Sequence, residues 1–205
     1  MGAAIWSAEP GAMFDFPARS FVRFFSNHGM LTVGKRPDWY VVPGGSRQYV
    51  ERMARPFRDR IRLNCPVQQV SRLETGVDIA SASGSERFDA VVMACHSDQS
   101  LNLLADKSAA EHDILSAFPY QENEAVLHTD SSLLPRRKAA WAAWNYHVPK
   151  YDTSRVAVTY NMNILQSLEA PDTYCVTLNH DQAIAPERVI ERITYHHPVF
   201  TAAGI

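Results

Sequence analysis

The sequence predicts an α/β (α+β) fold, and three observations support this class. Residues 17–28 place apolar side chains at helical spacing, which favours an amphipathic helix. Residues 90–95 are continuously apolar, as in a parallel-sheet strand that is covered on both faces. After residue 120 the segments typical of strands recur regularly, which favours a mostly antiparallel sheet; these are residues 124–129, 138–147, 155–161 and 173–179.

The amino-terminal part combines a helix with a glycine turn. Gly29 stands where the helix over residues 17–28 should end, because glycine readily adopts the conformation that follows a helix. Residues 39–42 are expected to form a short strand that ends at Pro43-Gly44-Gly45. Ser46 can then cap a helix that continues to about residue 55.

The middle of the chain is expected to be rich in strands. Residues 61–64 read as a strand, and residues 67–73 and 77–82 read as a hairpin around Glu74-Thr75-Gly76. Two helices should follow the apolar segment 90–95, over residues 97–104 and 109–117. Further on, residues 164–168 favour a short helix, and residues 186–194 are ambiguous between helix and strand.

Composition and charge exclude several classes of protein. The chain has 205 residues, 46% of them hydrophobic and 20% charged, with a formal net charge of −2. These values are typical of a globular protein and give no sign of a nucleic-acid partner. The one compact basic run, Arg136-Arg137-Lys138, is interpreted as a solvated loop. No apolar run approaches the roughly 20 residues of a transmembrane helix.

The cysteines and histidines do not indicate a metal site. Cys65, Cys95 and Cys175 are widely spaced, so neither a zinc ribbon nor a disulfide framework is supported, and a cytoplasmic location is expected. Cys65 and Cys95 end apolar segments and are expected to be buried thiols. His196 and His197 are adjacent and would point to opposite faces of a strand, so no metal is predicted.

The clearest candidate for ligand binding is Gly44-Gly45-Ser46, between an expected strand and an expected helix. Two adjacent glycines let the backbone pass close to a ligand, and a helix start presents free N–H groups. The alternative is an ordinary turn between a strand and a helix.

An ordered set of segments extends this observation. The glycine pair and its helix are followed by Val67-Gln68-Gln69-Val70, a hairpin, and Asp89-Ala90-Val91-Val92-Met93-Ala94. This order resembles the flavin-containing amine oxidase and phytoene desaturase superfamily. Segments such as Phe25-Ser26-Asn27-His28-Gly29 and Trp141-Ala142-Ala143-Trp144-Asn145-Tyr146 are similar to a bacterial subgroup of NAD/FAD-binding amine oxidoreductases.

The resemblance implies FAD as the cofactor and assigns residues to it. It implies that the backbone of Val67 pairs with the adenine. It implies that Ala94 and Cys95 pass near the phosphate and ribose, and that Gly44 and Gly45 lie on the flavin side. Because flavin carries the oxidation chemistry, no catalytic acid or base is required, and the catalytic residues stay unknown.

Aromatic residues are candidates for the substrate pocket. In flavin amine oxidases, aromatic side chains of the substrate sheet line the pocket in front of the flavin, and Trp141, Trp144 and Tyr146 are the candidates for this role here. On a strand, Trp144 and Tyr146 would face one way and Trp141 the other. The alternative is that all three are core or interface residues. His128 and Asp130 would share a face, which is interpreted as a polar sheet face.

The resemblance also implies segments that this sequence lacks. Its strand followed by G-x-G-x-x-G has no counterpart among the nine glycines, and neither has its closing glycine-rich segment. We therefore expect an internal fragment with a partial FAD-binding domain over residues 41–105. A discontinuous substrate domain is expected over residues 1–40 and 106–205.

Two functions follow from these expectations. The first is a fragment of an FAD-dependent oxidoreductase that acts on a small molecule, an amine or a lipid-like substrate. The alternative is a truncated, non-catalytic module that binds no flavin and acts through protein interaction.

Overall fold

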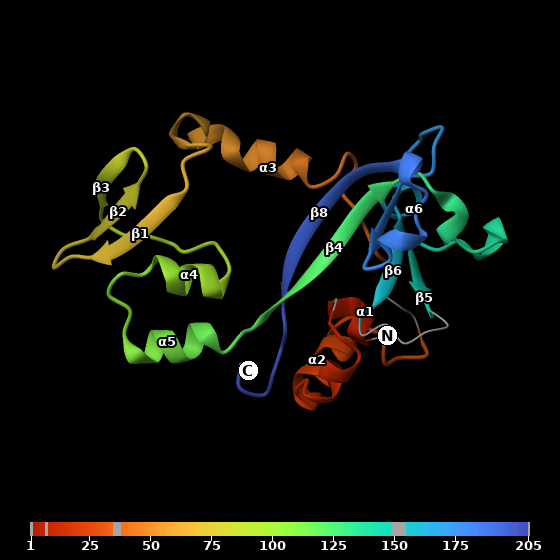
Figure 1. Ribbon diagram of the computed structural model, residues 1–205, viewed down its shortest axis with the longest axis horizontal. Helices are drawn as coiled ribbons and strands as arrows, with labels where there is room; N and C mark the ends of the chain where they lie inside the picture. The colour runs from red at the N-terminus through yellow and green to blue at the C-terminus, as the bar shows by residue number, and fades with distance from the viewer. Residues whose placement is uncertain (1, 7, 35–37, 149–154, 205) are drawn as a thin grey trace. The chain divides into compact units, whose positions relative to one another are not determined.

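The computed structural model describes residues 2–6, 8–34, 38–148 and 155–204. The chain consists of two compact units (Figure 1). Unit 1 comprises Met1–Arg52 and Tyr120–Ala202, and unit 2 comprises Met53–Pro119 and Ala203–Ile205. Helix α3 (Arg47–Ala54) carries the chain from the first unit into the second.

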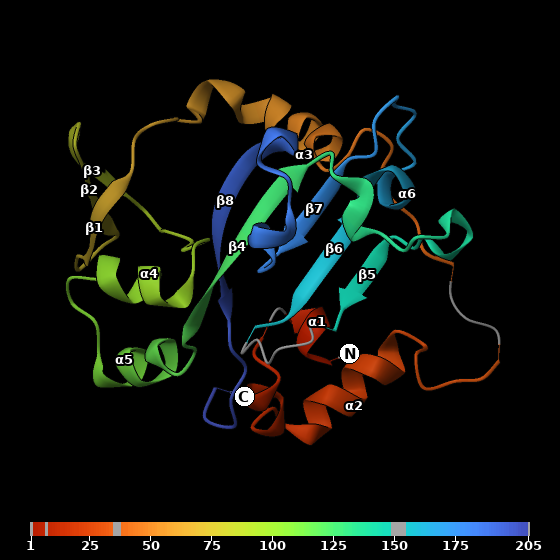
Figure 2. The same cartoon turned by 45° about the vertical axis from the view of Figure 1, so that its right-hand side comes forward.

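Unit 1 is built on an antiparallel five-stranded sheet in the order β5-β6-β7-β4-β8 (Figure 2). Its strands are β4 (Tyr120–His128), β5 (Trp144–His147), β6 (Ala157–Asn161), β7 (Cys175–Leu178) and β8 (Val189–Pro198). The strands expected near residues 124–129, 155–161 and 173–179 are confirmed. The ambiguous segment 186–194 begins as the 3₁₀ turn η6 (Pro186–Arg188) and continues as strand β8.

The amino-terminal helices of unit 1 are α1 (Gly2–Trp6), the 3₁₀ helix η1 (Gly11–Phe14) and α2 (Ala18–Asn27). Helix α2 confirms the prediction for residues 17–28. Ala3 and Ala4 of α1 form a buried cluster with Val158 of β6 and with Val156, which directly precedes this strand. The Trp6 ring lies next to the rings of Phe16, Phe21, Phe24 and Phe25. Helix α1 therefore covers part of one face of the sheet.

Short helical turns connect the strands of unit 1. They are α6 (Met162–Gln166), η3 (Ser131–Leu133), η4 (Lys138–Ala140) and η5 (Asp181–Ala183). Buried Val126, Leu133 and Ile184 pack together beside Val189 on the other face of the sheet. The strand expected over residues 138–147 is wrong in its first part, because residues 138–140 form η4 and only Trp144–His147 pair with β6.

Unit 2 contains an antiparallel sheet in the order β1-β2-β3, followed by two helices. The strands are β1 (Val67–Arg72), β2 (Val77–Ser81) and β3 (Gly84–Phe88), and the helices are α4 (Ser97–Leu103) and α5 (Ala109–Ser116). The 3₁₀ helix η2 (Arg55–Arg60) precedes this sheet. The predicted hairpin is confirmed, and Gly76 with φ +93° makes its turn.

Three expected strands are absent from the described part of the chain. Residues 39–42, 61–64 and 90–95 belong to no sheet. At residues 61–64 the backbone turns away, because Asn64 adopts φ +54° directly before Cys65 and Pro66. Residues 90–95 are apolar as a covered strand should be, but the described residues provide no neighbouring strand, and Val92 is 89% exposed. A strand needs a partner for its backbone groups, and an apolar sequence cannot supply one.

Arg72 connects β1 to the helical part of unit 2. Its guanidinium donates to Asp106 at 3.1 Å and to Glu111 of α5 at 2.8 Å. Ser108 caps α5 and also binds Glu111. The Arg72 guanidinium and then the Ser108 N–H lower the pKa of Glu111 from 4.5 to about 2.

This ion pair predicts a specific acid sensitivity. Because the pKa of Glu111 is depressed by folding, its stabilising contribution is present above pH 4.5 and is lost as the pH falls toward about 2. Arg72→Met should therefore lower the stability of the chain at neutral pH and flatten this acid-induced loss. Chemical unfolding at a series of pH values measures both effects, and Arg58→Met on exposed η2 is the control. An acid profile of Arg72→Met that parallels the wild type would contradict the assignment.

Candidate functional site

The turn at Pro43-Gly44-Gly45 has a defined geometry in unit 1. The Gly45 N–H donates to the Val42 carbonyl at 2.9 Å, and Gly44 adopts φ +79°. Proline followed by a glycine with positive φ is the pattern of a type II turn. Gly45 also has a positive φ of +78°, so neither glycine can be replaced without backbone strain.

This turn lies against helix α6, which directly follows strand β6. A methyl group added at Gly45 would lie 3.8 Å from Oε1 of Gln166, with nothing nearer. Asn161 at the end of β6 caps α6 by accepting the Ile164 N–H at 3.2 Å. Ser46 lies between the turn and α3, and its carbonyl accepts the Val50 N–H at 3.1 Å. The glycine pair therefore adjoins the end of the sheet at which β6 stops.

An aromatic patch, formed by Trp144, Tyr146 and Tyr160, lies on the sheet face that α1 covers only in part. Trp144 and Tyr160 are cross-strand partners, and their rings meet edge to face at 5.4 Å. Trp144 is 48% exposed and Tyr146 is 52% exposed, while Tyr160 is half-buried beside the α1 cluster. Burial raises the pKa of the Tyr160 hydroxyl, so it stays protonated at neutral pH.

Trp141, the third predicted aromatic residue, has a different position. It follows the 3₁₀ turn η4 and is half-buried in a loop. Its indole N–H donates to the Pro135 carbonyl at 2.8 Å, and the Lys138 ammonium lies 5.6 Å from its ring centre. The structure thus places Trp144 and Tyr146 on one face of the sheet, together with Tyr160. Trp141 instead stabilises the loop that precedes β5.

In unit 2, Val67 begins the edge strand β1 and lines a cavity of about 670 Å³. Arg60, Arg62 and the hydroxyl-bearing Ser81 and Ser83 also line this cavity. Arg62 pairs with Glu86 at 2.6 Å. Asp59 and Glu86 belong to the same lining, which thus combines cationic, acidic and hydroxyl groups beside an exposed strand edge.

Ala94 and Cys95 lie in the extended segment that leads into α4. Cys95 borders a second cavity of about 710 Å³, whose apolar lining includes Val70, Val77 and Leu104. Its sulfur lies 3.2 Å from the hydroxyl of buried Ser100. Ala94 is exposed, and its small side chain leaves the backbone accessible.

The cysteines differ from the expectation. Cys95 is exposed and Cys65 is half-buried, so the prediction of two buried thiols is wrong. Both segments lack the sheet neighbour that would have covered them. The fully buried cysteine is Cys175 of β7, and burial raises the pKa of its thiol to about 11.

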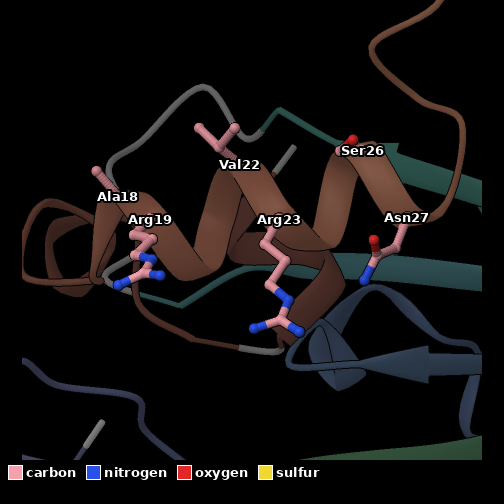
Figure 3. A pocket seen from close by; sticks show the side chains of 6 residues that line it. All are labelled: Ala18, Arg19, Val22, Arg23, Ser26 and Asn27. Carbon is pink, nitrogen blue, oxygen red and sulfur yellow. The ribbon is translucent and has the colours of Figure 1, made fainter.

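A shallow hollow of about 590 Å³ lies along the outer side of α2 (Figure 3). Arg19, Arg23 and Asn27 project from one stripe of this helix, beside Ala18, Val22 and Ser26. These positions form the solvent-facing side of an amphipathic helix whose Phe21 and Phe25 stack internally. None of the residues predicted as a site lines this hollow.

Neither a metal-binding cluster nor a membrane-spanning helix is found among the described residues. They contain no group of three or more side chains arranged to hold a metal ion. None of their helices is long and apolar enough to cross a membrane.

Comparison with known proteins identifies the class. The chain has the fold of flavin-dependent oxidoreductases: cyclohexylamine oxidase from Brevibacterium oxydans IH-35A matches 98% of it with a TM-score of 0.57 and 14% identity. The family model described as "Flavin containing amine oxidoreductase" matches residues 2–157. The chain belongs to this family.

Two other solved structures are similar. A protein of Exiguobacterium sp. 255-15, provisionally assigned as a protoporphyrinogen oxidase, matches 89% of the chain with a TM-score of 0.54 and 17% identity. The CLA-producing fatty acid isomerase from P. acnes matches 75% with a TM-score of 0.50 and 15% identity. The chain spans 52%, 47% and 40% of these three proteins, respectively. A search of curated proteins found no match.

Proposed function

We propose that this chain is part of an FAD-dependent oxidoreductase that oxidises an amine or a lipid-like molecule. Membership of the flavin containing amine oxidoreductase family supports a flavin cofactor. Such a cofactor, when bound, would supply the hydride-accepting chemistry, and the protein would orient the reactants and exclude water. The chain's own residues would then have two tasks, holding the cofactor and presenting the substrate.

The residues of unit 2 fit the adenosine end of FAD. Val67 lies on a strand edge, where its backbone can pair with a base, and the lining of the adjoining cavity of about 670 Å³ includes arginine and serine side chains beside two carboxylates. Arginine guanidinium groups suit phosphate oxygens. Ala94 and Cys95 would contribute accessible backbone next to small side chains. We assign Gly44, Gly45 and Ser46 of unit 1 to the flavin side of the cofactor.

The aromatic patch is the observation that carries the substrate assignment. Trp144, Tyr146 and Tyr160 offer a partly exposed apolar surface, and the Gly44-Gly45 turn adjoins the helix that follows Tyr160. The exposed side chains of the patch are aromatic, which favours an apolar substrate body over a strongly polar one. Cyclohexylamine oxidase and the fatty acid isomerase, by their names, act on molecules with such a body.

A non-catalytic interaction module is the second candidate. Unit 2 exposes apolar side chains of a kind that is normally buried in a folded domain. Leu63 is 80% exposed and Val92 is 89% exposed. Such surfaces are typical of places where another polypeptide binds. This candidate predicts a folded chain that binds no flavin and forms a complex or an oligomer.

Flavin binding by the purified chain discriminates the two functions. The first function predicts measurable FAD binding by the residues of this chain, and a Val67→Pro variant should bind FAD about tenfold more weakly, because proline removes the backbone N–H. Val67→Ala keeps the backbone and should bind as the wild type does. Quenching of flavin fluorescence during titration measures the affinity, and circular dichroism checks that both variants fold.

Two results of the FAD titration would contradict these expectations. A folded chain that binds no FAD would reject cofactor binding by this polypeptide and favour the interaction module. Equal affinities of Val67→Pro and Val67→Ala would reject the backbone role of Val67. If FAD binds, anaerobic bleaching of its absorbance by cyclohexylamine, putrescine or an unsaturated fatty acid identifies the substrate class.

A further inference from the structure

Four polar side chains form a continuous hydrogen-bonded row across unit 1. His128 of β4 contacts Thr177 of β7 at 2.7 Å, Thr177 contacts Thr159 of β6 at 2.7 Å, and Thr159 contacts His147 of β5 at 2.8 Å. We call these residues the polar row. These four strands lie side by side in the sheet (Figure 2), so the row joins all of them.

The row lies in the interior of the unit. His128, Thr159 and Thr177 are fully buried, and His147 at the other end is half-buried. Buried hydroxyl and imidazole groups are stable only when their hydrogen bonds are made. Every link therefore depends on the donor and acceptor roles of its neighbours.

One end of the row has a fixed direction. The Asp130 backbone N–H donates to Nδ1 of His128 at 3.1 Å, so this nitrogen is an acceptor. Neutral His128 must then carry its proton on Nε2, which donates to the Thr177 hydroxyl. When each hydroxyl donates onward, Thr177 donates to Thr159, and Thr159 donates to Nε2 of His147. In this order no buried proton of the row lacks an acceptor.

We propose that the polar row is a one-directional hydrogen-bond relay that holds β4, β7, β6 and β5 together, with His147 as its proton-sensitive end. A proton taken up at Nε2 of His147 turns the final acceptor into a donor. Thr159 must then turn its hydroxyl, and one buried O–H of the row is left without an acceptor. Proton uptake at His147 thus loosens the connection across the four strands.

The surroundings favour the neutral histidines. Burial, and then the neighbouring His180 ring at 5.2 Å, lower the pKa of His147 below its ordinary 6.5. Burial lowers the pKa of His128, against the opposing effect of Asp130. Other titratable described groups near the row are Cys175 beside His128 and, at the sheet edge, the ion cluster of Arg192 with Glu124 and Asp181.

The direction in which pH changes the stability of the fold follows from the lowered pKa values of His147 and His128. A histidine whose folded pKa is lower than its unfolded pKa contributes its stability fully above the unfolded value. The contribution of the relay is therefore complete above pH 6.5 and decreases as the pH falls from 6.5 toward the lower folded pKa of His147.

The test uses the full chain with isotope-labelled imidazoles. At pH 8, nitrogen NMR should find the proton of His128 on Nε2 and that of His147 on Nδ1. Thr159→Val removes the donor to His147 and keeps the side-chain shape, so the titration midpoint of His147 should rise by about half a pH unit or more. Thr159→Ser keeps the hydroxyl and should titrate as the wild type does.

Two results would overturn the proposal. One is a wild-type His147 that carries its proton on Nε2 at pH 8. The other is a folded Thr159→Val variant whose His147 titrates at the wild-type midpoint. If that variant does not fold, the tautomers of the wild type and of Thr159→Ser decide the question.

Discussion

Trp6→Ala is expected to lower the free energy of unfolding of unit 1 by about 3 kcal/mol, at the low end of the range for tryptophan-to-alanine changes because Trp6 is half-buried. Trp6 is the centre of an aromatic cluster, and its ring lies 4.5 to 6.3 Å from four phenylalanine rings, those of Phe16, Phe21, Phe24 and Phe25. Removing the indole leaves these rings around a cavity, so both transfer energy and packing are lost. Urea unfolding followed by far-UV circular dichroism measures the change.

Phe14→Ala is the matched control for this variant. Phe14 belongs to the neighbouring helix η1 but is 93% exposed, so its removal should change the free energy by less than about 0.5 kcal/mol. Similar losses in the two variants would mean that the cluster does not support α1 on the sheet.

Gly76→Ala is expected to destabilise unit 2 by about 2 to 5 kcal/mol. Gly76 has φ +93°, where an L side chain costs about 1 to 2 kcal/mol. A methyl group there would also collide with the carbonyl oxygen of Phe88, which is backbone and cannot turn away. Overpacking of this kind costs a further 1 to 3 kcal/mol or so. The tip of the β1–β2 hairpin should lose its order first.

Gly84→Ala separates the two contributions. Gly84 has φ +111° but open space around the added methyl, so it carries the backbone cost without the collision. The difference between the two variants in urea unfolding therefore measures the contact with Phe88. Equal losses would show that this contact is relieved by a small shift of the strand.

Local chemistry was sufficient to predict much of the fold. The hairpin followed from two strand-like segments on either side of Glu74-Thr75-Gly76, and α2 followed from helical spacing before Gly29. The segment 90–95 shows the limit of such reasoning. Its apolar run predicts a covered strand, but whether a neighbouring strand exists is decided by the rest of the fold, and the described residues supply none.

The candidate site was predictable to a similar extent. Strand alternation correctly grouped Trp144 with Tyr146, because both lie in β5. Tyr160 was missed, since its pairing with Trp144 depends on register between strands that local sequence does not encode. His128 was recognised only as part of a polar face, and Thr159 and Thr177 were not recognised at all. Threonine is common in strands, so the sequence did not indicate that Thr159 and Thr177 are buried and hydrogen-bonded to each other. The roles of Gly44, Val67, Ala94 and Cys95 at the cofactor stay predictions.

The polar row also affects how this sheet can diversify. Thr159 is followed by Tyr160 on the opposite face, so a slip of β6 by one residue would exchange a buried hydroxyl for a bulky ring. The polar row thus disfavours incorrect strand register from the opposite face of the sheet, independently of the side chains on the aromatic face. Substitutions at Trp144, Tyr146 or Tyr160 would then alter the aromatic face while the strand alignment stays unchanged. The aromatic face can therefore vary in sequence without loss of the register of the sheet.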